Sequence, residues 1–306
     1  MMSFLTKERD LLLQIILFWD PPLHFYYYSL SNNVMNHINL KNISYKYSGL
    51  FQALTEINME IKGGELWAIL GSNGTGKSSL LNVMAGLVFP DTGGYCIDDQ
   101  EVSEHSLKDK NFNIKFRRAI GYIFQNTNFQ LFCPTVLDEL IFGPMQMGMK
   151  KDEVYERAES VLKMLGLEDL RKRSTHMLSG GERKKVALGS ILTYNPQIIL
   201  FDEPMSGLDP RSQSFVIELI FQLNEAGKTI VITTHNLELV SHLQPRIAVL
   251  SEDHRLVRTG DTNEVLSDVE FLISVNLIHE SLHRHNNQIH SHISPLNWSH
   301  KHNSKL

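Results

Sequence analysis

The sequence predicts an α/β fold with a mainly parallel β-sheet, and three observations lead to this prediction. Short apolar runs such as Ile198 to Phe201 alternate with stretches of helical apolar spacing. A glycine-rich run, Gly71 to Ser78, lies between the apolar run Leu66 to Leu70 and an apolar helical stretch that begins at Leu80. Because strands that alternate with helices form crossover units, most strands of the core are expected to be parallel.

The first part of the fold is predicted to be a small antiparallel sheet. Ile38 to Tyr47 and Ala53 to Ile61 alternate apolar and polar residues, and Ser48-Gly49 supplies turn chemistry between them. After the glycine-rich run and its helix, a turn at Pro90 to Gly94 leads into a hairpin-like segment, Tyr95 to Val102. These segments predict an N-terminal β subdomain beside the parallel-sheet core.

The segment at about 126–191 is predicted to form an inserted helical subdomain. Apolar residues recur at helical spacing before a glycine that is a typical helix cap, Gly166; they are Val154, Ala158, Val161, Leu162 and Leu165. The chain then returns to the sheet with Ile198 to Phe201 and Thr229 to Thr233, which a helical pattern from Ser212 to Leu223 separates.

The chain is expected to have three parts: an extension at 1–34, one domain at 36–277 and a flexible tail at 278–306. Leu11 to Trp19 is apolar, and a signal-like segment, an interfacial anchor, a docking helix and translation from an upstream start codon all remain open for the extension. The tail is rich in His, Asn and Ser and loses the apolar periodicity.

Composition limits the classes of function. The 29 Lys and Arg against 34 Asp and Glu give a formal net charge of -5, which predicts no global attraction to nucleic acid. The two cysteines, Cys96 and Cys133, lack C-x-x-C spacing, as expected in a reducing compartment. No run in the sequence approaches the roughly 18 to 20 apolar residues that a membrane span requires.

The glycine-rich run matches the phosphate-binding pattern G-x-x-x-x-G-K-[ST] in full. Glycines allow backbone N–H groups to point at phosphate oxygens, Lys77 supplies a positive charge for the β and γ phosphates, and Ser78 offers a hydroxyl to Mg²⁺. The expected nucleotide-binding residues here are Gly71, Ser72, Asn73, Gly74, Thr75, Gly76, Lys77, Ser78 and Ser79. An ordinary glycine-rich turn is the alternative, and the flanking strand and helix disfavour it.

Two carboxylates follow the apolar strand at Ile198. At the end of a buried parallel strand, Asp202 is placed to hold Mg²⁺, and Glu203 is then free to orient or deprotonate an attacking water. The alternative for Glu203 is a helix-capping acid before Pro204. Beside a phosphate loop, the catalytic interpretation is favoured.

The pentapeptide Leu178-Ser179-Gly180-Gly181-Glu182 precedes an apolar helical stretch. Ser179 is a candidate N-cap, and the glycines leave backbone donors exposed, so this helix start is a candidate anion site. It lies in the helical insert, where it is not expected to reach the phosphates of its own chain.

These elements together resemble ATP-binding-cassette (ABC) ATPases over about Asn39 to Val265. Leu178 to Glu182 resembles the L-S-G-G-Q signature of that family, with Glu182 in place of Gln, a departure that activity is expected to tolerate. Further positions resemble the glutamine loop at Gln125, the dimer-communication loop at Ser206 and Asp209, the switch histidine at His235 and the adenine-stacking aromatic at Tyr47.

The resemblance implies ATP and Mg²⁺ as cofactors, with Mg²⁺ held through Ser78, Gln125 and Asp202. It implies catalytic roles for Glu203, His235 and Gln125. It also implies that two such domains pack head to tail, so that Lys77 of one and Ser179 of the other bind the same ATP. Taken singly, a loop amide, a strand-end histidine and a core aromatic would explain Gln125, His235 and Tyr47; their order and spacing favour the family.

The cargo is suggested by two further features. The segments Gln130-Leu131-Phe132 and Phe142-Gly143-Pro144 resemble energy-coupling-factor importer ATPases, and the His-rich tail resembles that of cobalt and nickel importers. Pairs with H-x-H spacing are candidate ligands for a transition metal; they are His283, His285, His290, His292, His300 and His302. A solvated tail that happens to be rich in histidine, or an affinity-tag-like remnant, is the alternative.

The sequence therefore predicts the ATP-hydrolysing subunit of a membrane importer for nickel or cobalt ions, on the cytoplasmic face of the cell membrane. Its expected partners are a second ABC ATPase subunit and transmembrane coupling and substrate-specificity subunits, without nucleic acid. A vitamin, another cation or an exported solute remains open as cargo. A soluble ABC ATPase acting on nucleic acid or the ribosome, and a metal-storing or metal-sensing protein, are alternatives of other classes.

Overall fold

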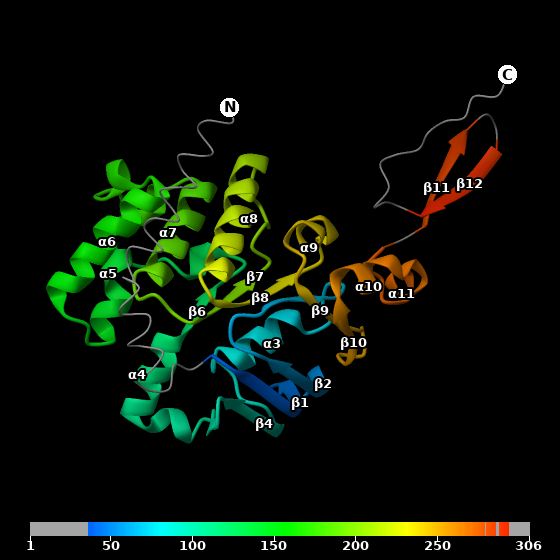
Figure 1. Cartoon of the computed structure of the whole chain (residues 1–306), viewed down its shortest axis with the longest axis horizontal. Coiled ribbons are helices and arrows are strands. Elements are labelled where there is room, and N and C mark those ends of the chain that lie inside the picture. The colour runs from blue at the N-terminus through cyan, green and yellow to red at the C-terminus, as the bar shows by residue number, and fades with distance from the viewer. Residues whose placement is uncertain (1–35, 279, 286–287, 294–306) are drawn as a thin grey trace.

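A computed structural model of the chain describes residues 36–278, 280–285 and 288–293 (Figure 1). Within this part the protein is an α/β fold with two main sheets, and the predicted fold class is confirmed. The predicted extension at 1–34 lies outside the described residues.

The four-stranded sheet is antiparallel and has the order β2-β1-β4-β5. Its strands are β1 Ile38–Tyr47, β2 Phe51–Ile61, β4 Thr92–Ile97 and β5 Gln100–Glu101. In β2, the alternating positions Ile57, Met59 and Ile61 are at most 5% exposed. The alternation that predicted half-buried strands is therefore the alternation between core and solvent.

The six-stranded sheet has the order β10-β9-β3-β8-β7-β6, and all its neighbours are parallel except β10. Its strands are β3 Leu66–Leu70, β6 Ile120–Ile123, β7 Ile198–Asp202, β8 Thr229–Thr234, β9 Arg246–Leu250 and β10 Leu256–Asp261. β7 and β8 are buried along their whole length, which explains the continuous apolar run Ile198 to Phe201 in β7.

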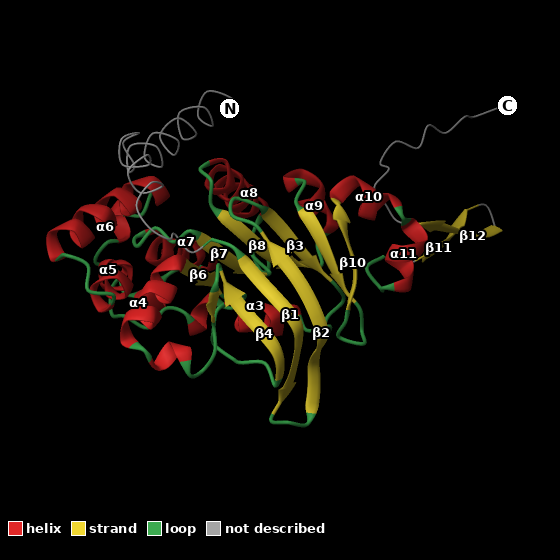
Figure 2. Cartoon of the chain, turned by 60° about the horizontal axis from the view of Figure 1, so that its bottom comes forward, coloured by secondary structure: helices red, strands yellow, loops and turns green. Residues whose placement is uncertain are grey.

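The helix after the phosphate loop, α3 Lys77–Met84, packs between the two sheets (Figure 2). Its Leu80, Leu81, Val83 and Met84 are at most 1% exposed, so apolar residues face both sheets. Because both layers hold α3, the loop at its N-terminus starts from a fixed position.

Three helices gather at one end of the molecule as the helical subdomain: α5 Val136–Gln146, α6 Lys151–Leu165 and α7 Gly180–Leu192 (Figure 1). The remaining helices are α4 Lys110–Ala119, α8 Pro210–Glu225, α9 Leu237–Leu243, α10 Thr262–Ser267 and α11 Val269–Ser274. α6 ends at Gly166, which adopts φ 63°, as the predicted helix cap requires.

After Ile278, β11 Glu280–His285 and β12 Gln288–Ile293 pair as an antiparallel hairpin. The sequence composition predicted a flexible tail there, and the hairpin adds regular backbone structure to part of that range. Whether the tail is flexible stays a prediction, because residues 294–306 lie outside the described part.

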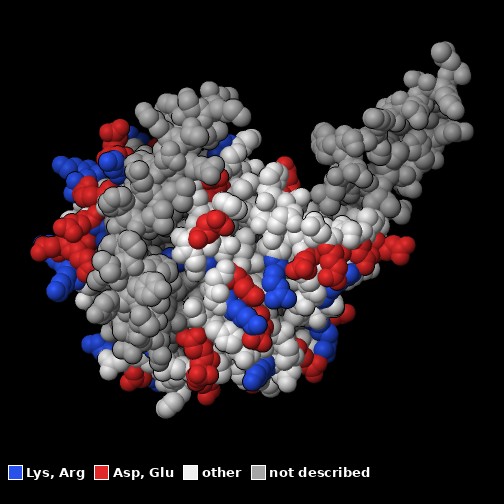
Figure 3. All heavy atoms as spheres, viewed as in Figure 1, with Lys and Arg blue, Asp and Glu red and all other residues white. Residues whose placement is uncertain are grey.

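On the face seen in Figure 3, Lys and Arg side chains are intermixed with Asp and Glu side chains over the described surface. Such mixing gives no single-sign field on that face. The expectation that nucleic acid is not a partner stays a prediction from net charge.

Candidate active site

The phosphate loop leaves the sheet at the carboxyl end of β3 and is held by its own side chains. Lys77 Nζ donates hydrogen bonds to the carbonyl oxygens of Gly71, at 2.8 Å, and of Ser72, at 3.0 Å. Thr75 Oγ1 donates to the Ser72 carbonyl at 3.0 Å. Gly76 has φ 104°, and a Cβ there would collide with the carbonyl oxygen of Ala53, so only glycine fits.

Asp202 ends β7 beside the start of α3. Its Oδ1 accepts hydrogen bonds from Ser78 Oγ, at 3.0 Å, and from Thr233 Oγ1, at 2.5 Å. Asp202 is only 5% exposed. The buried Asp202 carboxylate therefore contacts the Ser78 hydroxyl, and these are two of the groups that the sequence predicted to bind Mg²⁺.

Glu203 follows in a left-handed backbone conformation, with φ 43° and a side chain that is almost fully buried. This conformation is uncommon for a residue with a side chain and is held in place by the hydrogen bond from the Glu203 N–H to the Thr233 carbonyl at 3.0 Å. Its Oε1 lies 2.8 Å from His235 Nδ1, and Thr234 Oγ1 donates to Oε2 at 3.3 Å. Two neighbours on β8 and its end thus orient the Glu203 carboxylate.

Lys77 also lies 3.9 Å from Glu203 Oε1. Burial lowers the pKa of the Lys77 ammonium, and the carboxylates of Glu203 and Asp202 act in the opposite direction. The Lys77 ammonium therefore lies near the two carboxylates at the N-terminus of α3, where its own phosphate loop surrounds it.

Gln125 and Tyr47 lie at the edges of this site. Ile123 pairs in parallel with Phe201, so Gln125, two residues past β6, leaves the sheet at the same edge as Glu203; its side chain is exposed. The hydroxyl of Tyr47 lies 3.2 Å from Ser79 Oγ, while 41% of Tyr47 is exposed. The predicted adenine-stacking residue thus touches the phosphate-loop helix and keeps an open ring.

The signature segment is the N-terminus of α7, with Ser179 as N-cap. Ser179 Oγ accepts from the Glu182 N–H at 3.3 Å, and Glu182 Oε2 accepts from the Ser179 N–H at 2.7 Å, a complete capping box. The hydrogen bond from the Ser179 backbone lowers the pKa of Glu182, and Arg173 lies 3.8 Å away. Glu182 therefore performs the cap that a glutamine could also perform, and Gly180 and Gly181 keep the exposed backbone.

The dimer-communication segment lies against the signature segment of the same chain. Asp209 caps α8, accepting from the backbone of Arg211 and Ser212 at 3.0 and 3.1 Å and from Ser212 Oγ at 2.6 Å. A Cβ added to Gly181 would lie 3.0 Å from Ser212 Oγ. The starts of α7 and α8 are thus adjacent, and Ser206 is exposed on the loop between β7 and α8.

The structure brings one predicted group together and leaves another apart. Lys77, Ser78, Asp202, Glu203 and His235 form one connected cluster. The hydrogen bonds and ion pairs described for Ser179 and Glu182 are with each other, with the Arg183 N–H and with Arg173, and none of these joins them to the phosphate loop.

The predicted metal-binding histidines fall on β11 and β12 or beyond. His283 pairs with His290 across the hairpin, and Ser281 pairs with His292. His300 and His302 lie outside the described residues. Among residues whose side chains the structure describes, no group of three His, Cys, Asp or Glu is arranged to hold a metal ion.

Sequence reasoning missed two residues near the site. Lys184 is 4% exposed although it is a lysine, and Thr233 anchors both Asp202 and Glu203 from β8. Lys184 shares helical spacing with Leu188 and Ile191, which are also buried, so continuing the apolar stripe one turn back would have predicted its burial. Thr233 was predicted to lie in a strand, and nothing in the sequence indicated that its hydroxyl would contact Asp202 and Glu203.

Comparisons with known proteins show the family of the chain. The sequence model of the family described as ABC transporter matches residues 54–206. An energy-coupling factor transporter ATP-binding protein, EcfA, of Methanosphaera stadtmanae is 36% identical over 78% of this chain and 84% of its own length.

Two solved structures are also similar. CbiO1 of Clostridium perfringens, described as part of the ABC transporter complex CbiONQ, has a TM-score of 0.66 and 35% identity over 78% of this chain and 94% of its own. A dimeric bacterial ABC transporter cassette has a TM-score of 0.65 and 32% identity over 74% of this chain and 98% of its own. The chain belongs to the ABC transporter family of ATPases, as its motifs indicated.

In the described residues, the structure contains no helix with the length and apolar character of a membrane span.

Proposed function

We propose that this chain is the ATP-hydrolysing energy-coupling subunit of a membrane importer for nickel or cobalt ions. The observation that carries the proposal is the cluster of Lys77, Asp202, Glu203 and His235 at one sheet edge. A groove lined by Phe124, the residue before Gln125, lies nearby. The first feature supplies phosphoryl chemistry, and the second supplies a surface for a partner that receives the motion.

ATP hydrolysis follows from the arrangement of the cluster. Lys77 and the loop N–H groups bind the β and γ phosphates, and in doing so Lys77 exchanges its contacts with the Gly71 and Ser72 carbonyls for contacts with phosphate. Glu203 accepts a proton from a water that attacks the γ phosphorus, while the bond from that phosphorus to the β–γ bridging oxygen breaks and ADP leaves. His235 orients the Glu203 carboxylate.

The residues present fit Mg²⁺. Ser78 Oγ and Asp202 Oδ1 lie 3.0 Å apart at the same edge, and Gln125 leaves the sheet there. Hydroxyl, carboxylate and amide oxygens are the donors that Mg²⁺ prefers. When bound, the ion neutralises charge on the phosphates.

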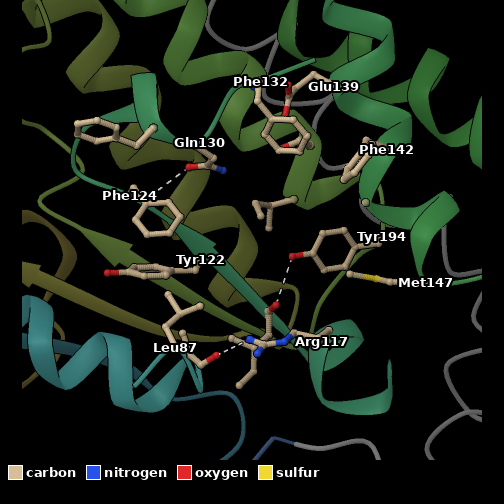
Figure 4. Close-up of a pocket in the computed structure, with 16 residues that line it drawn as sticks. Leu87, Arg117, Tyr122, Phe124, Gln130, Phe132, Glu139, Phe142, Met147 and Tyr194 are labelled. Atoms are coloured by element: carbon tan, nitrogen blue, oxygen red, sulfur yellow. Dashed lines mark hydrogen bonds between the residues drawn. The ribbon is translucent and has the colours of Figure 1, made fainter. Parts of the chain in front are cut away.

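An aromatic groove of about 350 Å³ lies between the helical subdomain and the α4–β6 region (Figure 4). We define the groove by Phe124, Phe129, Phe132, Phe142 and Tyr194. Phe129 is 83% exposed and Phe132 is 62% exposed, although both side chains are large and apolar. An exposed apolar groove of this kind suits a segment of a partner, here the transmembrane coupling subunit.

A second ATPase subunit completes the ATP site in the proposal. Gly180 is exposed and Gly181 is partly exposed, and both lie at the N-terminus of α7, where backbone N–H groups are suited to bind an anion. The similar cassette whose structure is dimeric supports a pair of such subunits. In the proposal the two subunits pack head to tail, so that this helix start binds the γ phosphate held by the other subunit.

The choice of nickel or cobalt depends on the tail. Its six histidines in H-x-H pairs are imidazole ligands suited to Ni²⁺ and Co²⁺, and the pairing of His283 with His290 places two of them at opposite positions of one hairpin. The similarity to EcfA and to CbiO1 supports a transporter of the energy-coupling-factor type, and the choice of ion rests on the tail.

The test is purification from membranes with the partner subunits, followed by ion uptake into vesicles with ATP on the side of this chain. We expect ATP-dependent accumulation of Ni²⁺ or Co²⁺. ATP hydrolysis with no accumulation of either ion would retain the ATPase and reject the cargo.

A chain shortened after Ile278 provides a matched test of the tail. Weaker Ni²⁺ or Co²⁺ binding with ATP hydrolysis retained is expected, and unchanged metal binding would remove the tail from the argument.

A further inference from the structure

A buried lysine lies next to the signature segment, and none of the steps above uses it. Lys184, on α7 two residues after Glu182, is 4% exposed. Burial lowers the pKa of its ammonium to about 8, and the Asp202 carboxylate opposes that shift. Because burying a cation costs stability, a lysine at this place calls for a function that an apolar side chain could not perform.

Lys184 contacts Phe124, the residue that precedes Gln125. Lys184 Nζ donates to the Phe124 carbonyl oxygen at 3.5 Å. The N–H of Phe124 donates to Gln130 Oε1 at 3.2 Å, and Gln130 Nε2 donates to the Ala187 carbonyl at 3.2 Å (Figure 4). Both backbone polar groups of Phe124 are therefore connected to the signature helix α7, one directly and one through an amide.

We propose that Lys184 and Gln130 are positioning residues that hold Gln125 in a fixed place relative to the signature helix, by binding the two backbone polar groups of Phe124. This inference rests on the proposed role of Gln125 in hydrolysis. The carbonyl of Phe124 belongs to the peptide bond that joins it to Gln125, so a displacement of this carbonyl turns the same peptide plane from which Gln125 begins.

The position of Phe124 extends the inference to the partner. The Phe124 ring forms part of the aromatic groove, and Gln130 lines the same groove. A segment bound in the groove therefore contacts Phe124 and Gln130 directly. Its binding shifts Gln125 and the start of α7 together, which brings both half-sites under the control of one surface.

The experiment is a double-mutant cycle between Lys184→Met and Gln125→Ala, measured as kcat and KM for ATP in the full chain. Lys184→Met is expected to lower kcat by about tenfold or more with KM for ATP nearly unchanged, since misplacement of a group by a fraction of an ångström is enough to slow the reaction. In the Gln125→Ala background the same substitution is expected to lower kcat by less than about twofold, because the residue it positions is gone.

The unfolding midpoint of the Lys184→Met chain without nucleotide should equal or exceed that of the unaltered chain, because a buried cation is replaced by an apolar side chain of similar length. A second readout, independent of turnover, uses the Glu203→Gln background: Lys184→Met should raise the ATP concentration needed for association of two chains. Gln130→Leu should reproduce the loss of kcat and its dependence on Gln125.

Lys185→Met is the matched control. Lys185 is the next residue on α7, and it donates to the Leu165 carbonyl at 3.0 Å and lies 4.9 Å from the Phe215 ring, away from Phe124. Any effect of this control on kcat should be the same with and without Gln125.

Equal losses of kcat from Lys184→Met in both backgrounds, a falling unfolding midpoint, or full turnover in the single variant would each overturn the inference. Full turnover in Gln125→Ala would instead reject the proposed role of Gln125. The two failures are thus distinguishable.

Discussion

The two helix starts proposed to bind phosphate are built in opposite ways. At α3 the helix is buried between two sheets, Lys77 is 7% exposed and lies 3.9 Å from Glu203, and Ser78 donates a hydrogen bond to Asp202. At α7 the signature segment is exposed, and a local capping box satisfies it. In our proposal, the first is a preorganised catalytic half-site, and the second is a half-site that a second chain completes. The difference teaches where substitutions should affect chemistry and where they should affect association.

Glu203→Gln should have the largest effect on the buried half. Loss of the base is expected to lower kcat by about 10² to 10⁴-fold while ATP still binds, so ATP-bound pairs of chains should accumulate. Phosphate release and size-exclusion chromatography with ATP measure the two outcomes.

Glu252→Gln is the control for that variant, because Glu252 is another carboxylate near the phosphate loop, with Ser72 Oγ donating to it at 3.4 Å. Its turnover should stay close to that of the unaltered chain. Undiminished turnover in Glu203→Gln would remove Glu203 from the catalytic role.

Lys184 should make the stability of the nucleotide-free chain depend on pH. Its folded pKa of about 8 lies below the ordinary lysine value, so the folded state binds fewer protons between about pH 8 and 10.5. Below pH 8 the cost of the buried cation is fully present, at about 3 kcal/mol, and it is relieved as pH rises through this window.

The measurement is the difference in unfolding free energy between Lys184→Met and the unaltered chain, because other titrating groups cancel. The variant should be the more stable chain near pH 7, and this advantage should shrink between pH 8 and pH 10. A difference that stays constant across this range would contradict the buried, charged state of Lys184.

Ser179→Ala tests the exposed half with a smaller expected effect. Loss of the N-cap should lower the free energy of unfolding by about 1 kcal/mol. Chemical denaturation measures this change. Thr135→Ala, which removes the N-cap of α5 in the same subdomain, is the matched control: it should cost similar stability and leave the ATP dependence of association unchanged, whereas Ser179→Ala should weaken association.

Glu182→Gln should have the smallest effect. Glutamine can accept the same hydrogen bond from the Ser179 N–H, so the capping box is retained and turnover should change by less than about twofold. Steady-state ATPase assays measure this change. A larger loss would mean that the charge of Glu182, beside Arg173, matters for the second half-site.

The sequence predicted the buried half well because its signals are local. The phosphate loop, the strand before it and the carboxylates that end β7 are each encoded within a few consecutive residues. The alternation in β1 and β2 likewise placed the N-terminal sheet.

Other parts could not be predicted because they depend on tertiary packing. β6 has only four residues and follows α4 directly, so its apolar run has no turn signal before it. The hydrogen bond from Lys184 to Phe124 joins residues 60 positions apart, and the one from Gln130 to Ala187 joins residues 57 positions apart. No spacing in the sequence indicates these contacts.

The central claim is that the two helix starts complete each other in two different chains. The most direct test mixes a Lys77→Met chain, which lacks the phosphate-binding cation, with a Gly181→Asp chain, whose added carboxylate repels phosphate at the signature segment. Each variant alone should be inactive, and the mixture should regain ATP hydrolysis, because a mixed pair contains one intact site. Full turnover by Gly181→Asp alone, or a mixture no more active than its components, would contradict the claim.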